Sequence, residues 1–191
     1  FDMTQSSRIL HIFGDEGICR ATIELYKKLE QFDQNYLIIS DIPQKSEQLY
    51  PNAPTVTSIL FSKGSYKIIA SKIKDYDIII LQALSVEKAK AIVENRFKDK
   101  VFIWALWGFG LYNIVNYFTP SKNAITTTTA ERSLKQKLQD FYTYRIIYRK
   151  ALKKIKICVF LLEHDFDLLT KTINHNAIWM TACYQTKENL L

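Results

Sequence analysis

The residues of this sequence that could do chemistry lie in short polar loops, each directly after an apolar run. The first loop follows segment 8–13 and contains Gly14, Asp15 and Glu16, with His11 just before it. Glycine permits close backbone approach, and the start of a following helix favours an anion. A carboxylate or imidazole here could also act as a general base. A plain turn stays open, because the glycine spacing of a nucleotide-binding loop is missing.

Two further loops supply candidate binding residues. They are Gln82, after segment 77–81, and Trp107, Gly108, Gly110 and Tyr112, after segment 101–106. An aromatic ring beside a glycine backbone suits a sugar ring, a base or a lipid-linked group. We expect Trp104 to be a core residue, whereas Trp107 and Tyr112 could be either core or binding residues.

A fourth polar cluster follows Phe160. Its members are Glu163, His164, Asp165 and Asp167. Acids beside a histidine could hold a general base. They also suit the first turn of an ordinary helix, where acidic side chains complement the helix dipole.

Positive charge is concentrated between Lys122 and Lys156, where ten basic residues face two acidic ones, a net +8. The rest of the chain has 16 basic and 17 acidic residues, a net −1. The spacing of apolar residues predicts a long helix over 130–154. Its cations could face anionic lipid, nucleic acid or solvent. We expect membrane or anion binding and no nucleic acid, because no nucleic-acid motif accompanies the charge. The candidates are Arg145, Arg149, Lys150, Lys153 and Lys154.

The elements that must position these loops alternate between strand and helix. Strands are predicted over 8–13, 36–39, 56–61, 77–81, 101–106, 157–161 and 177–180. Helices are predicted over 18–32, 66–73, 85–97, 130–154 and 164–172. Such alternation indicates a doubly wound, Rossmann-like α/β fold with a mainly parallel sheet. Ligands of these folds bind beyond the carboxyl ends of the strands.

Composition is that of a globular protein, with 48% apolar and 24% charged residues. Cys19, Cys158 and Cys183 have no C-x-x-C spacing, so neither a zinc site nor a disulfide framework is predicted. No apolar run approaches the roughly 18 residues of a spanning helix. We therefore expect a cytoplasmic protein, soluble or peripheral on a membrane.

Three segments together resemble the bacterial 4-alpha-L-fucosyltransferase family (TDP-N-acetylfucosamine:lipid II N-acetylfucosaminyltransferase-like glycosyltransferases). They are His11–Asp15 (HIFGD), Leu81–Ala83 (LQA) and Ile103–Tyr112 (IWALWGFGLY). The family opens with a strand ending in His-x-x-Gly-x-Asp and later carries Trp-Gly-x-Asp-Leu-Tyr. The resemblance covers most of this chain, as the N-terminal half of the family's length.

The resemblance implies a GT-B-type, metal-independent glycosyltransferase that uses no cofactor. A deoxy-sugar would pass from a nucleotide diphosphate to a lipid-linked saccharide at the inner face of the bacterial cell membrane. The donor would bind mainly a C-terminal domain beyond this chain. Residues 1–180 would form the acceptor-side domain, and 181–191 would begin a linker or second domain.

By the same resemblance, His11, Asp15 or Glu16 would act as the base. Gly14, Gln82, Trp107, Gly108, Gly110 and Tyr112 would bind substrate. Two departures from the family pattern stand out: Gly110 replaces the aspartate, and Gly14 and Asp15 are adjacent. A non-catalytic α/β module that docks on membranes or acidic partners through its basic helix is the alternative.

Overall fold

Seven strands form one sheet in the computed structural model, which describes residues 7–14, 19–28, 31–43, 56–94, 97–106, 109–118 and 133–181. The strands are β1 (Arg8–Gly14), β2 (Asp33–Ser40), β3 (Val56–Leu60), β4 (Ile78–Gln82), β5 (Val101–Ala105), β6 (Ile155–Phe160) and β7 (Ile178–Thr181). Their spatial order is β3-β2-β1-β4-β5-β6-β7, and all neighbours are parallel. The doubly wound, Rossmann-like fold predicted from the sequence is therefore confirmed.

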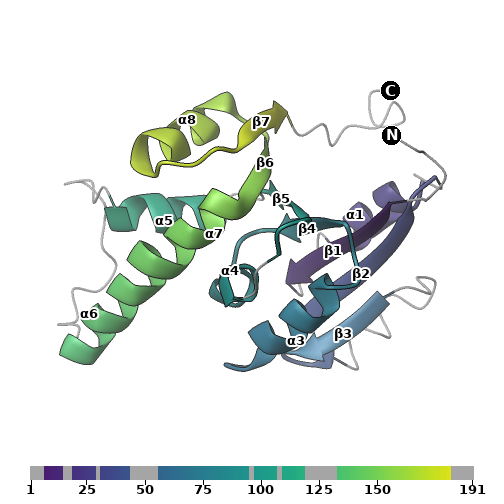
Figure 1. Cartoon of the computed structure of the whole chain (residues 1–191), viewed down its shortest axis with the longest axis horizontal. Coiled ribbons are helices and arrows are strands. Elements are labelled where there is room, and N and C mark those ends of the chain that lie inside the picture. The colour runs from purple at the N-terminus through teal and green to yellow at the C-terminus, as the bar shows by residue number, and fades with distance from the viewer. Residues whose placement is uncertain are drawn as a thin grey trace.

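Helices connect the strands (Figure 1). They are α1 (Cys19–Lys27), α3 (Ser65–Ile73), α4 (Val86–Glu94), α5 (Phe109–Phe118), α6 (Leu134–Phe141), η1 (Tyr142–Tyr148), α7 (Arg149–Lys154) and α8 (Glu163–Thr172). The backbone stays helical at the α6–η1 and η1–α7 boundaries, so Leu134 to Lys154 is one continuous helix with a central π-helical segment.

The two faces of the sheet are covered by different elements. On one face, Leu10, Ile12 and Trp104 belong to the large core, together with buried residues of α3, α4, α5, η1, α7 and α8. On the other face, Phe13, Tyr36 and Ile38 pack with Ile23 of α1 in a smaller core. Strands covered on both faces explain the nearly continuous apolar runs of β1 and β4.

The largest difference from the predicted elements is α5. The glycines at 108 and 110 suggest a loop, whereas the helix begins at Phe109. Its buried residues Leu111, Ile114 and Val115 have the helical spacing of a packed face. The predicted helix over 18–32 was too long, since α1 ends at Lys27 and β2 already begins at Asp33. The predicted helix start at residues 130–132 lies outside the described residues.

Candidate functional site

The topology places a switch point between β1 and β4. From β1 the chain proceeds to β2 on one side, whereas β4 lies on the other side of β1. Ile12 is level with Leu81, so Gly14 and Gln82 end adjacent strands at the same edge of the sheet. In open α/β sheets the crevice at such a switch point is the usual ligand site. Two predicted binding residues therefore lie at the edge where the fold favours a ligand.

The loop after β4 has an unusual backbone. Ala83 has φ of 56°, a left-handed conformation that costs an alanine about 1–2 kcal/mol. The amide of Ala83 donates to the carbonyl of Ala105 at 3.0 Å, which ties the loop to the end of β5. Such strained residues persist where the surroundings hold them, and they cluster at ligand sites.

Lys88 of α4 lies beneath this loop. Its ammonium donates to the carbonyl oxygens of Gln82 and, at 3.2 Å, of Ala83, and the side chain is buried. The Ser85 hydroxyl accepts from the amide of Lys88 at 3.3 Å, as an N-cap side chain does. Lys88 was not among the residues predicted from the sequence. It lies beside Ala89 and four residues before Ile92, which are both buried. This helical spacing was the sign in the sequence that the Lys88 side chain faces the core.

The helices that follow β5 and β6 are joined by a side-chain hydrogen bond. The Tyr112 hydroxyl of α5 donates to Asp165 Oδ1 of α8 at 2.8 Å. This hydrogen bond is the largest cause that raises the pKa of Tyr112 above its ordinary value. Among the acidic residues of α8, Glu163 and Asp167 are exposed, whereas Asp165 is buried. The structure thus selects Asp165 from the predicted cluster and places it beside a predicted binding residue.

Gly110 brings the first turn of α5 against the β4 loop. A Cβ built at Gly110 would lie 3.7 Å from the amide nitrogen of Leu84, an ordinary contact. The Tyr148 hydroxyl of η1 donates to the carbonyl oxygen of Leu84 at 3.2 Å. The β4 loop is therefore held by hydrogen bonds from Lys88 of α4 and Tyr148 of η1. The first turn of α5 packs beside it.

His11 lies inside the protein, three residues before the end of β1. It has no exposed surface, and its Nε2 lies 3.0 Å from Gln34 Oε1. The rings of Tyr26 and Tyr36 flank it at centroid distances of 4.4 and 5.0 Å. Burial lowers the pKa of His11 to about 4, so the imidazole is neutral at pH 7. Within the described part of the chain, its Nδ1 has no hydrogen-bond partner.

Tyr26 links this histidine to the switch point. Burial raises the pKa of Tyr26, and a hydrogen bond to the side chain of Gln82 opposes that shift. A polar path therefore runs from Gln34 and His11, past Tyr26, to Gln82 at the carboxyl edge. The other predicted residues of this edge, Asp15, Glu16, Trp107 and Gly108, lie outside the described residues.

The predicted cations lie elsewhere. Lys153 and Lys154 end α7 directly before β6 begins, which places them at the amino edge of the sheet, opposite Gln82. The Lys154 ammonium donates to the carbonyl of Ile92 at 2.7 Å. The Arg145 guanidinium lies 4.8 Å from the centroid of the Phe118 ring. Arg149 and Lys150, like Arg145 and Lys153, are exposed.

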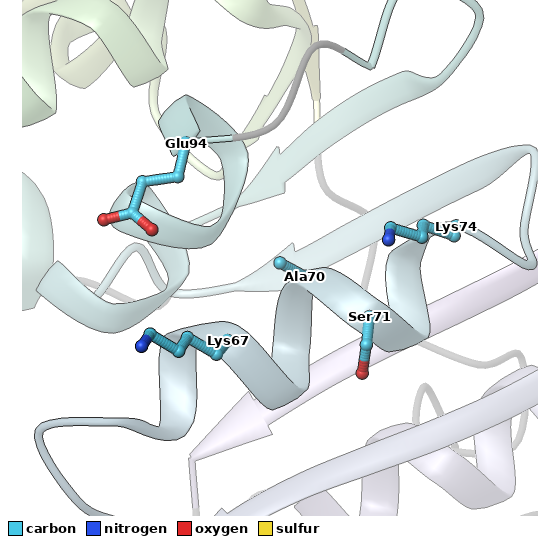
Figure 2. Close-up of a pocket in the computed structure, with 5 residues that line it drawn as sticks. All are labelled: Lys67, Ala70, Ser71, Lys74 and Glu94. Carbon is cyan, nitrogen blue, oxygen red and sulfur yellow. The ribbon is translucent and has the colours of Figure 1, made fainter.

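A pocket of about 190 Å³ lies between α3 and α4 (Figure 2). It is lined by Lys67, Ala70, Ser71 and Lys74 of α3 and its flank and by Glu94 of α4. None of these is a residue singled out in the sequence. Across the described ranges, no group of three His, Cys, Asp or Glu side chains could hold a metal ion. No helix in that part of the chain is long and apolar enough to cross a membrane.

No protein-family model matches the sequence, and no curated protein matches it either. Among solved structures, a Listeria monocytogenes protein described as a UDP-N-acetylglucosamine 2-epimerase is similar, with a TM-score of 0.52 and 13% identity. The match covers 92% of this chain and 45% of that chain. A Clostridium acetobutylicum chorismate mutase/shikimate 5-dehydrogenase fusion reaches a TM-score of 0.35 at 12% identity, over 94% of this chain and 43% of its own. The first likeness supports the Rossmann-like fold.

Proposed function

We propose that this chain is the acceptor-side half of a GT-B-type glycosyltransferase. The enzyme moves a fucose-type or deoxy-amino sugar from a nucleotide diphosphate to a lipid-linked saccharide, in the synthesis of a bacterial surface polysaccharide. The observation that carries the proposal is the switch point between β1 and β4, where Gly14 and Gln82 end neighbouring strands. The fold it shares with a protein described as a UDP-N-acetylglucosamine 2-epimerase, a sugar-nucleotide enzyme, supports this class of substrate.

The proposal divides the work between two halves. This chain spans less than half of the similar structure, and we assign the donor site to a second half. The acceptor saccharide then lies over the carboxyl edge, bordered by the β4 loop, Gly110 and Tyr112. The protein would work at the inner face of the cell membrane, without metal or cofactor.

Asp15 and Glu16 are the proposed bases, because they directly follow Gly14 at the switch point. A base removes the proton of the acceptor hydroxyl while its oxygen forms a bond to the sugar and the bond from the sugar to the leaving nucleotide diphosphate breaks. His11 is neutral but fully buried, so its surroundings favour a positioning role through Tyr26 and Gln82 over direct contact with the acceptor.

A transfer assay on the full-length protein tests the proposal. The substrates are a panel of nucleotide-diphosphate sugars and a short-chain prenyl-diphosphate N-acetylglucosamine, and mass spectrometry follows the acceptor. We expect the acceptor to gain one sugar residue, and D15A/E16A to abolish this. Asp99→Ala, an exposed acidic position just before β5 at the amino edge of the sheet, is the matched control. Isomerisation of the donor sugar without transfer, or full activity of D15A/E16A, would overturn the assignment.

A non-catalytic binding module is the second candidate function, because Gly110 stands where the resembled family has aspartate. The structure allows a direct test, because a Cβ at Gly110 makes ordinary contacts only. If the wild-type protein binds acceptor without transfer while Gly110→Asp transfers sugar, this chain is a binding module derived from an enzyme. If Gly110→Asp lowers an existing transfer rate, the glycine belongs to the working site.

A further inference from the structure

The first half of the long helix carries an apolar stripe that faces solvent. Leu134, Leu138, Phe141 and Tyr142 are 75%, 61%, 53% and 54% exposed. The first three are spaced by four and three residues, so they share one side of α6. Neighbouring exposed apolar residues of this size are unusual on a soluble surface and mark an interaction site.

The core does not account for this stripe. Tyr144, Ile147, Tyr148, Ala151 and Leu152 of the same helix pack in or against the large core. By contrast, none of the residues described for α6 is buried. Figure 1 shows α6 extending away from the strands, at the free end of the long helix.

The start of α6 is nevertheless well defined. The Ser133 hydroxyl accepts from the amide of Gln136 at 3.3 Å, and the Gln136 side chain accepts from the amide of Ser133 at 2.9 Å. This capping box satisfies two amides at the helix start and stabilises its first turn. The stripe is therefore presented by a formed helix.

Cations surround the stripe. Lys135 and Lys137 are exposed on α6, and Arg145, Arg149 and Lys150 follow on the same helix, also exposed. Asp140 is the one acidic residue of the sequence from Leu134 to Lys154. An apolar stripe edged by lysine and arginine is the pattern of a helix that lies in the interface of a bilayer with anionic headgroups. Nucleic acid would use the cations but leave the stripe without a role.

We propose that α6 docks on an anionic lipid bilayer. Leu134, Leu138, Phe141 and Tyr142 enter the boundary between headgroups and acyl chains, and Lys135 and Lys137 contact the headgroups. The inference deepens the proposed function, because it names the surface that would approach a lipid-linked acceptor. Its test measures lipid binding and no sugar transfer, so either proposal can fail while the other stands.

Vesicle flotation of this chain tests the docking, with vesicles of phosphatidylcholine alone or mixed with phosphatidylglycerol. We expect binding to the mixed vesicles and a loss of about tenfold or more in L134S/L138S/F141S, because three apolar side chains leave the lipid. Ile68→Ser is the matched control, an exposed apolar residue on α3. Both variants should unfold at the wild-type denaturant concentration.

The charges are tested in the same assay. K135E/K137E should lose the preference for phosphatidylglycerol, whereas K63E/K98E, two exposed lysines outside the long helix, should keep it. Hydrogen exchange should show slower exchange of the α6 amides on mixed vesicles. Absence of binding to phosphatidylglycerol would overturn the proposal. Lipid binding by L134S/L138S/F141S at the wild-type level would also overturn it. A third contradicting result is an oligonucleotide that competes with vesicles and binds the triple variant as well as the wild type.

Discussion

The two ends of the long helix have similar sequences and opposite surroundings. α6 (LKQKLQDF) and α7 (RKALKK) both combine leucine with lysine. In α7, Ala151 and Leu152 are buried against α4 and the sheet, whereas no described residue of α6 is buried. Both ends therefore carry apolar side chains among cations, and the neighbouring elements decide whether these side chains become core or an exposed surface.

Truncation of one leucine at each end gives the largest expected contrast. Leu152→Ala should lower the free energy of unfolding by about 2–5 kcal/mol, because it leaves a cavity in the core. Leu138→Ala should change it by less than about 0.5 kcal/mol, since the side chain is exposed. Urea unfolding followed by circular dichroism measures both. Equal losses would mean that α6 packs like α7.

His11 and His175 also lie in different surroundings, and the pH dependence of stability should reveal the difference. The pKa of His11 is lowered to about 4 by burial, against 6.5 for an exposed histidine. As pH falls from 6.5 to 4, the unfolded chain gains a proton that native His11 does not, so stability is lost over this window. The loss approaches about 3 kcal/mol.

His11→Gln should remove most of this pH dependence. Half-buried His175 has a pKa lowered in the same direction, so His175→Gln should change the pH profile less. Unfolding by urea at pH 4.5, 5.5 and 7 provides the comparison. An unchanged slope in His11→Gln would show that other groups cause the acid sensitivity.

Lys154 and Lys135 allow a comparison between a lysine that stabilises the fold and a lysine that contacts lipid. Lys154→Met should cost about 1 kcal/mol of stability, because the carbonyl of Ile92 loses a donor. Its effect on vesicle binding should be small. Lys135→Met should leave stability unchanged and weaken binding to anionic vesicles severalfold. If Lys154→Met weakens vesicle binding and Lys135→Met does not, the lipid-binding surface lies at the α7 end.

The helix cap gives the smallest expected effect. Ser133→Ala removes the capping box of α6, which locally costs about 1 kcal/mol. Exchange of the α6 amides should become faster, while the α7 amides and the global unfolding midpoint stay unchanged. Hydrogen exchange read by mass spectrometry resolves the two segments. Faster exchange in both would mean that the helix frays as one unit.

Much of this fold could be predicted from the sequence because its central strands are covered on both faces. The apolar runs of β1, β4 and β5 mark their positions within one or two residues. The start of α5 was missed, since glycines 108 and 110 outweighed the helical spacing of Leu111, Ile114 and Val115. The exposure of α6 could not be predicted, because an amphipathic pattern does not say what covers it.

The candidate site was only partly accessible to sequence reasoning. Gly14 and Gln82 could be found because strand ends are visible in a sequence. The Tyr112–Asp165 hydrogen bond joins residues separated by 53 positions, and no spacing rule connects them. The Lys88 side chain is buried, whereas a lysine near a helix start is expected to face solvent.

The most direct test of the account is to locate the acceptor on this chain by NMR. An isotope-labelled sample is titrated with short-chain prenyl-diphosphate N-acetylglucosamine, and amide shifts are mapped by residue. We predict the largest changes at Gly14, Gln82 to Ser85, Gly110 to Tyr112, and Asp165, all at the carboxyl edge. Changes confined to the pocket between α3 and α4, at Lys67 and Lys74, or no changes at saturating acceptor, would contradict the proposed site.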